Sequence, residues 1–259
     1  MIFREDPADA ATGTAVLEFQ EAGGAEGIEF FIGNDDSDTG LRVNSTAVSR
    51  FWGRNLAFEG PLQRPGASAI HIAQTFVFGH VTFSDLNAVM ISGGTCDDTT
   101  HLIRGESGAQ LEIFDFWLEV TGSGCAPGAG GKSALLNIES WPTGWIRNGN
   151  LVVPNDADWR AFRVDGNDAN VKLAVQDVDI ISKGSTTLAS ALIHVTPAAG
   201  GTPSSLHFED VRGLRWLDRS IENWGGITPT GRLTDDHEIL DVFVNASHGA
   251  TDPECYRLN

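Results

Sequence analysis

Lysine, cysteine and long apolar runs are scarce in this chain of 259 residues. Its lysines are Lys132, Lys172 and Lys183, and acidic residues outnumber basic ones by 35 to 17, which gives a net charge of −18. A surface this acidic repels a phosphate backbone. The composition therefore argues against nucleic acid as a partner.

The cysteines are too few and too widely spaced to suggest a metal site. Cys96, Cys125 and Cys255 have neither a CxxC motif nor a His/Cys ligand spacing around them. We therefore predict no zinc site, no other metal and no cofactor, and we expect buried free thiols.

Apolar stretches are short throughout the chain. None approaches about 18 consecutive residues, so the sequence predicts no membrane span. The opening residues, MIFREDPADAATG, lack a basic segment followed by an apolar run. This pattern predicts that the chain carries no secretion signal.

Glycine is abundant, with 30 residues, and the chain repeats with a period near thirty. One alternating apolar segment begins each unit, at Leu41, Ile70, Leu102, Leu136, Phe162 and Ile193. The steps between these positions are 29, 32, 34, 26 and 31 residues. Alternation of apolar and polar residues is typical of strands rather than helices.

A second alternating segment repeats in step with the first. It reads FWGRNLAF (51–58), FVFGHVTF (76–83), LEIFDFWLEV (111–120), WIRNGNLVV (145–153), LAVQDVDII (173–181) and LHFEDVRGL (206–214). A Gly, Asn, Asp or Glu interrupts each copy near its middle, which predicts a corner where the chain turns onto another sheet. Stacked coils explain this shared period better than a sandwich, whose strands recur every ~8–12 residues.

The segments RVNSTAVSRFWGRNLAFEG (42–60) and VKLAVQDVDIIS (171–182) resemble coils of the right-handed parallel β-helix of the pectin-lyase-like superfamily. The resemblance covers residues 14–216. It implies an all-β solenoid of about six to eight coils with a C-terminal cap.

Both ends of the chain depart from the repeat. We predict an N-terminal arm over residues 1–13 and a cap or assembly segment over residues 217–259, because a solenoid must cover its terminal coils. Within the cap, a short helix over Asp235–Phe243 and a strand over Ile239–Val244 both fit the residues.

Carboxylates that fall one coil apart are the catalytic candidates. Enzymes with the resembled fold carry carboxylates on the outer face of neighbouring coils, which here implies Asp177, Asp179, Glu209 and Asp210. The alternative is that these acids bind turn backbone at a corner. The Asn-Thr-Asp, Gly-His-Gly and Arg-Ile-Lys motifs of the galacturonan hydrolases are missing. The sequence thus favours a protein that is not an enzyme and leaves the question open.

Aromatic side chains are the candidates for binding. Four of the seven tryptophans could contact a sugar ring or a neighbouring subunit, with burial in the core as the alternative. They are Trp117, Trp145, Trp216 and Trp224. His71 and His194 occupy equivalent places in the repeat, and we expect a structural or surface role for both.

The resemblance extends to phage tail-spike modules and to the trimeric cement, or decoration, proteins of phage heads. It implies a structural homotrimer on the virion exterior, made in the host cytoplasm, that bridges other capsid or tail proteins. Two alternatives stay open. One is a polysaccharide lyase or hydrolase, and the other is a receptor-recognising module that binds a host surface glycan without chemistry.

Overall fold

The computed structural model describes most of the repeat and a few strands at each end. The described residues are 2–4, 14–32, 37–75, 79–93, 99–106, 108–122, 133–139, 143–154, 159–165, 172–183, 193–196, 204–212, 221–223, 240–244 and 256–258. Most of the end strands, including β14 and β16 to β18, are described by their backbone alone.

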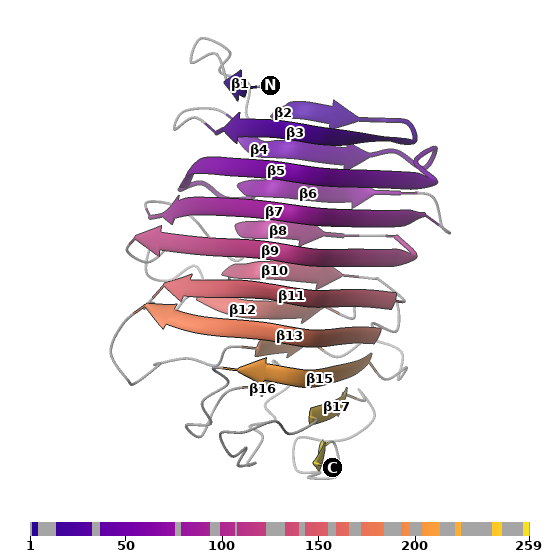
Figure 1. Ribbon diagram of the computed structural model, residues 1–259, viewed down its shortest axis with the longest axis vertical. Coiled ribbons are helices and arrows are strands. Elements are labelled where there is room, and N and C mark those ends of the chain that lie inside the picture. The colour runs from indigo at the N-terminus through magenta and orange to yellow at the C-terminus, as the bar shows by residue number, and fades with distance from the viewer. Residues whose placement is uncertain are drawn as a thin grey trace.

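Two sheets, which we call sheet A and sheet B, contain all the strands (Figure 1). The ten-stranded sheet A contains β1 (Ile2–Arg4), β3 (Gly23–Phe31), β5 (Arg50–Leu62), β7 (His80–Ser92), β9 (Gln110–Gly122), β11 (Thr143–Pro154), β13 (Lys172–Lys183), β15 (Ser204–Arg212), β17 (Leu240–Val244) and β18 (Tyr256–Leu258). The eight-stranded sheet B contains β2 (Thr14–Phe19), β4 (Ser37–Asn44), β6 (Ser68–Gln74), β8 (His101–Gly105), β10 (Ser133–Glu139), β12 (Trp159–Asp165), β14 (Ile193–Thr196) and β16 (Ile221–Asn223).

From β1 to β16 the chain alternates between the sheets, and neighbouring strands within each sheet pair in parallel. The predicted all-β parallel solenoid is therefore confirmed. The first segment of every unit lies in sheet B, where Leu41 pairs with Ile70, Ile70 with Ile103, and Leu136 with both Ile103 and Phe162. In the third unit the equivalent residue is therefore Ile103, one residue after the predicted Leu102. One period of the sequence thus corresponds to one turn of the solenoid. About four turns are complete, fewer than the six to eight coils predicted, because the flanking units contribute only short or partly described strands.

Apolar side chains from both sheets fill the space between them. Phe30 stacks on Phe58 with ring centroids 4.6 Å apart, and Phe51 lies between Phe19 and Phe83 at 5.0 and 5.7 Å. Full burial of one such side chain stabilises the fold by roughly 1.5–3 kcal/mol. Like residues therefore stack on like residues from coil to coil, and this stacking holds the strand register.

The second segments form the long strands of sheet A, with two differences from the prediction. Residues 76–78 of FVFGHVTF lie outside the described residues, and the strand of that unit is β7, which begins at His80. The interruption does not lead onto another sheet, since each long strand stays in sheet A on both sides of it. The physical reason is that one residue with positive φ bends the strand at the same place in each copy, and the ladder skips that residue and resumes in the same register after it.

Strand pairing changes from parallel to antiparallel at the C-terminal end of sheet A. β17 adds to β15 in antiparallel orientation, and β18 adds to β17 in the same way. Of the two predictions for this segment, the strand over Ile239–Val244 is close to the observed β17, whereas no helix is found at Leu240–Val244. At the other end, part of the predicted arm forms β1, which pairs in parallel with β3.

Candidate binding surfaces on sheet A

One residue with left-handed backbone conformation recurs at the same place in every long strand. We call this set the corner row: Gly27, Asn55, Asp85, Asp115, Asn148 and Asp177. Their φ angles lie between 50° and 64°. Short polar side chains and glycine tolerate this conformation best, which explains why Asn and Asp interrupt the apolar alternation. Each corner residue lies between an outward and an inward side chain, so it divides the outer surface of sheet A into two halves.

A groove of about 490 Å³ lies along the corner row. Polar side chains from four neighbouring strands line most of it: Asp85, Asn87, Asp115, Asn148, Asn150, Asp177 and Asp179. The Asn148 Nδ2 donates a hydrogen bond to the Asp115 Oδ1, and Arg54 lies 3.5 Å from the Asp85 carboxylate. The groove is therefore rich in hydrogen-bond acceptors, and some of its charge is already compensated.

Trp117 is the large aromatic side chain of this groove, and it is 40% exposed. Its indole Nε1 donates a 2.9 Å hydrogen bond to the carboxylate of Glu119, which is only 8% exposed. This bond fixes the orientation of the ring on the surface. A fixed, half-exposed indole beside hydrogen-bond acceptors has the chemistry needed to stack a sugar ring.

The candidate residues from the sequence only partly meet in this groove. Asp177, Asp179 and Trp117 all line it. Glu209 lies on the next strand and accepts a 2.6 Å hydrogen bond from Gln176, which occupies its carboxylate. Asp210 follows it in β15, beside Asp177 in the register, and its side chain lies outside the described residues.

The remaining aromatic candidates are separated from this groove or not described. Trp145 is 38% exposed but lies on the other half of sheet A, before the corner row. Trp216 and Trp224 lie outside the described residues, as do all three cysteines, Cys96, Cys125 and Cys255.

The half of sheet A before the corner row has an unusual composition. Between β5 and β13, its exposed outward side chains form what we call the basic–aromatic face: Arg50, Trp52, Arg54, Trp145, Arg147 and Lys172. Every Lys or Arg side chain that is exposed in the described part of the chain belongs to this face. Arg147 also lies over the Phe114 ring, 5.2 Å from its centroid. Within the described residues, the exposed positive charge of a protein with a net charge of −18 thus lies on one surface.

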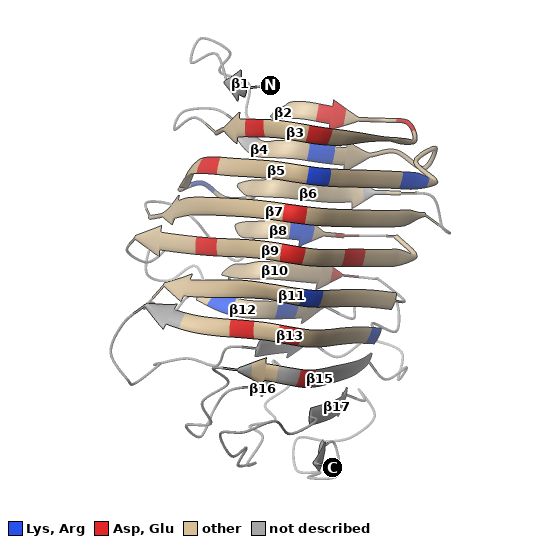
Figure 2. Cartoon of the chain, viewed as in Figure 1, with Lys and Arg blue, Asp and Glu red and all other residues tan. Residues whose placement is uncertain are grey.

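The half of sheet A after the corner row has the opposite character. We call its outward residues between β5 and β13 the acidic–aliphatic face, defined by Glu59, Val89, Ile91, Trp117, Glu119, Asp179 and Ile181. None of the described side chains of this face is basic. Figure 2 shows this division: one end of the long front strands carries blue on β5, β11 and β13 and red on β9, and the other end carries red without blue. Ile91 is 50% exposed and Ile181 is 40% exposed, so the face offers apolar area as well as negative charge.

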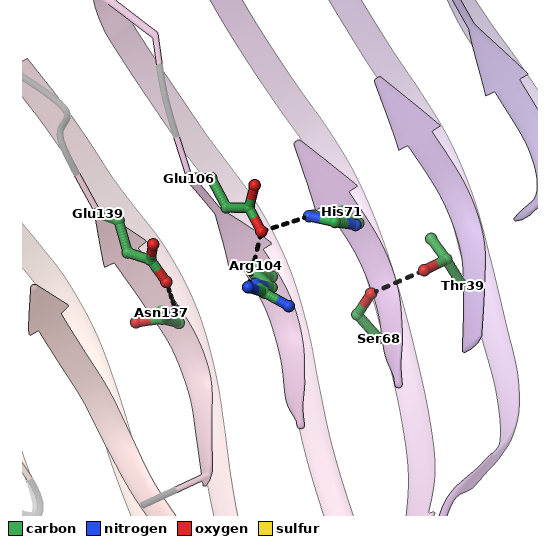
Figure 3. Close-up of polar contacts among 7 residues, drawn as sticks. All are labelled: Thr39, Ser68, His71, Arg104, Glu106, Asn137 and Glu139. Atoms are coloured by element: carbon green, nitrogen blue, oxygen red, sulfur yellow. Dashed lines mark hydrogen bonds and ion pairs between the residues drawn. The ribbon is translucent and has the colours of Figure 1, made fainter. Parts of the chain in front are cut away.

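Sheet B uses its charged residues differently (Figure 3). The Glu106 carboxylate lies 3.0 Å from the His71 Nε2 and 2.7 Å from an Arg104 nitrogen. On the next strand, β10, the Asn137 side chain donates a 2.6 Å hydrogen bond to Glu139. These groups are buried or partly buried and bind one another within the chain, although Arg104 Nε and Asn137 Oδ1 have no hydrogen-bond partner among the described residues.

The pKa of Glu106 reflects this network. Burial raises the pKa of the carboxyl group, but the hydrogen bond from His71 and the charges of Arg104, His71 and Arg42 outweigh burial. The pKa of Glu106 is therefore lowered from its ordinary value. His71 and His194 do occupy equivalent register positions, as predicted, and His71 has the structural role expected of it.

Neither a metal centre nor a membrane segment emerges from the described part of the chain. Its His, Cys, Asp and Glu side chains form no group of three or more that could hold a metal ion. Within the same residues there is no helix long and apolar enough to cross a membrane. Comparison with protein-family models, with curated proteins and with solved structures finds no match for this chain.

Proposed function

We propose that this protein is a non-catalytic structural subunit that works as a homotrimer of side-by-side solenoids. The observation that carries the proposal is the basic–aromatic face. Four exposed cations and two exposed tryptophans share one surface of a strongly acidic chain. Arg and Trp are the residues most enriched where subunits bind one another, and separate acidic molecules repel unless such a surface compensates the charge.

A place on the outside of a phage virion, as a capsid decoration protein or a tail spike, belongs to the same proposal. Its support is the resemblance of the repeat to those trimeric proteins, together with the parallel solenoid. On this view the protein acts mechanically and bridges neighbouring shell or tail subunits. Labelling the protein on intact particles tests this part: binding to a capsid or tail would support it, and absence from particles would refute it.

The test of the assembly is the native mass of the purified protein by light scattering over a range of concentrations. We expect a species near three times 27.7 kDa that persists on dilution. A protein that stays at 27.7 kDa at every concentration would exclude the proposed trimer.

A second candidate function is glycan binding without chemistry, and the groove beside the corner row favours it. Trp117 could stack a sugar ring while Asp and Asn side chains accept hydrogen bonds from hydroxyl groups. The test is binding of purified protein to a panel of neutral and acidic oligosaccharides. A ligand that binds the native chain and loses at least about tenfold in affinity in the Trp117→Ala variant would support this function. Equal binding by both proteins would place the ligand elsewhere.

A further inference from the structure

We infer that copies of this chain associate in parallel, with the basic–aromatic face of one copy against the acidic–aliphatic face of the next. This inference rests on the proposed function and names the interface that it requires. The two surfaces belong to the same long strands and meet at the corner row.

Charge is the first argument for this pairing. Because each copy carries a net charge of −18, most ways of bringing two copies together are repulsive. The described exposed Lys and Arg side chains all lie on the basic–aromatic face. The surface that complements them best has to be acidic and free of basic groups. Among the described side chains of sheet A, the acidic–aliphatic face meets that condition.

Side-chain type is the second argument. The basic–aromatic face exposes Trp52 at 43% and Trp145 at 38%, and the opposite half exposes Val89, Ile91 and Ile181 at 36 to 50%. Indole rings packed against branched aliphatic side chains bury apolar area that is in contact with water in the single chain. Burial of that area contributes roughly 25 cal/mol per Å² before the costs of association.

Symmetry supplies the third argument and makes the pairing specific. In a closed ring whose axis runs parallel to the stack of coils, rotation keeps every coil at its own height. The same strand of two neighbouring copies then meets across the interface. On β5, Trp52 lies between Arg50 and Arg54, and Glu59 lies beyond the corner on that strand. The Glu59 of one copy therefore approaches the arginine pair of the next.

Exposed positions on β5 allow a charge-swap test that leaves the core untouched. One variant carries Arg50→Glu and Arg54→Glu, a second carries Glu59→Arg, and a third carries all three substitutions. We expect each of the first two to raise the subunit dissociation constant by about tenfold or more, and the third to recover most of the loss. Sedimentation velocity measures the association, and far-ultraviolet circular dichroism shows that each variant is folded.

A matched control distinguishes this interface from a general effect of charge. Glu18 is exposed on β2 of sheet B and so lies on neither face, and Glu18→Arg changes the net charge as Glu59→Arg does. We expect association in the Glu18→Arg variant to stay equal to or exceed that of the native chain. Association lost equally in both variants would overturn the inference.

The failure of this inference and the failure of the proposed function look different. If the native chain is a monomer, the proposed function itself is refuted. If the native chain is a trimer but the triple variant associates no better than the first two variants, the trimer is supported and the pairing of the two faces is overturned. The pairing also encloses the groove at the ring axis. An intact oligomer that still binds a glycan through Trp117 would therefore contradict the inference.

Discussion

The outward surfaces of the two sheets carry charged residues for different purposes. On sheet B, His71, Arg104 and Glu106 lie within hydrogen-bonding reach of one another and are partly buried. On sheet A, Arg50 and Arg147 are exposed. Charges that are compensated inside one chain stabilise its fold, whereas charges left in solvent are available to a partner. The difference separates a surface that maintains the solenoid from a surface that can recognise another molecule.

Among the substitutions that test this difference, we expect the largest loss of stability on sheet B. Replacing Glu106 with Gln leaves the volume but removes the charge that holds His71 and Arg104. We expect the free energy of unfolding at neutral pH to fall by about 1–3 kcal/mol, as is usual for a hydrogen bond to a charged group. Glu59→Gln, on sheet A, is the matched control and should change the stability of the single chain by no more than ~0.5 kcal/mol. Urea denaturation measures both.

The next effect is the pH dependence of the same network. The pKa of Glu106 is lowered in the folded chain, so the carboxylate stabilises the fold above the pKa of the unfolded chain. That contribution is lost as the pH falls below 4.5 and through the folded pKa. Thermal unfolding between pH 7 and pH 3 should therefore show a steeper loss for the native protein than for Glu106→Gln. Parallel curves would mean that other carboxylates dominate the acid response.

A smaller effect is expected at the corner row, where the two halves of sheet A meet. Asn148→Asp removes the hydrogen bond to Asp115 and places a third carboxylate between Asp115 and Asp177. We expect a loss of about 1 kcal/mol or less at pH 7 that disappears in acid, because these side chains are exposed. Asn55→Asp, whose neighbour Asp85 is already close to Arg54, should lose less. Equal losses would show that repulsion along the row is unimportant.

The smallest effect on stability is expected on the basic–aromatic face itself. In the Arg50→Glu, Arg54→Glu background, at a protein concentration below its dissociation constant, Trp52→Ala should change the unfolding free energy by no more than ~0.5 kcal/mol. Its neighbour Phe51 points into the core, and Phe51→Ala should cost about 3–5 kcal/mol. In the otherwise native chain, Trp52→Ala should instead weaken association. A large stability loss from Trp52→Ala alone would mean that the ring serves the fold.

The solenoid was predictable because its two tracks repeat independently in the sequence. Leu41, Ile70 and Leu136 were assigned to the same place in the repeat, and the register confirms this. Where the prediction was wrong, the cause is local geometry. The corner was expected to start a new sheet, but a positive φ at residues such as Asp85 bends a strand that continues in its sheet.

The candidate surfaces were less accessible to sequence analysis. Asp177, Asp179 and Trp117 were predicted because carboxylates and tryptophans are candidate catalytic or binding residues by their side-chain chemistry alone. The basic–aromatic face was missed because the repeats were aligned on their apolar runs and not on the corner residues. The run FVFGHVTF (76–83), for example, ends before the corner at Asp85, so outward residues of neighbouring strands were not compared in register. Aligning the repeats on Asn55 and its equivalents would have brought Arg54 and Arg147 into one column.

The fixed register of sheet A has a consequence for how this molecule can change length. Repeats differ by up to seven residues, from a step of 26 between Leu136 and Phe162 to a step of 33 between Ile70 and Ile103, yet the strands remain in register, so the segments between strands absorb the difference. One residue inserted within a long strand would turn every following side chain of that strand to the opposite face of the sheet. Duplicating or deleting a whole coil would instead lengthen or shorten the molecule by roughly 4.8 Å and preserve both outer surfaces. The length of the solenoid can therefore change by whole coils, but not by single residues within a long strand.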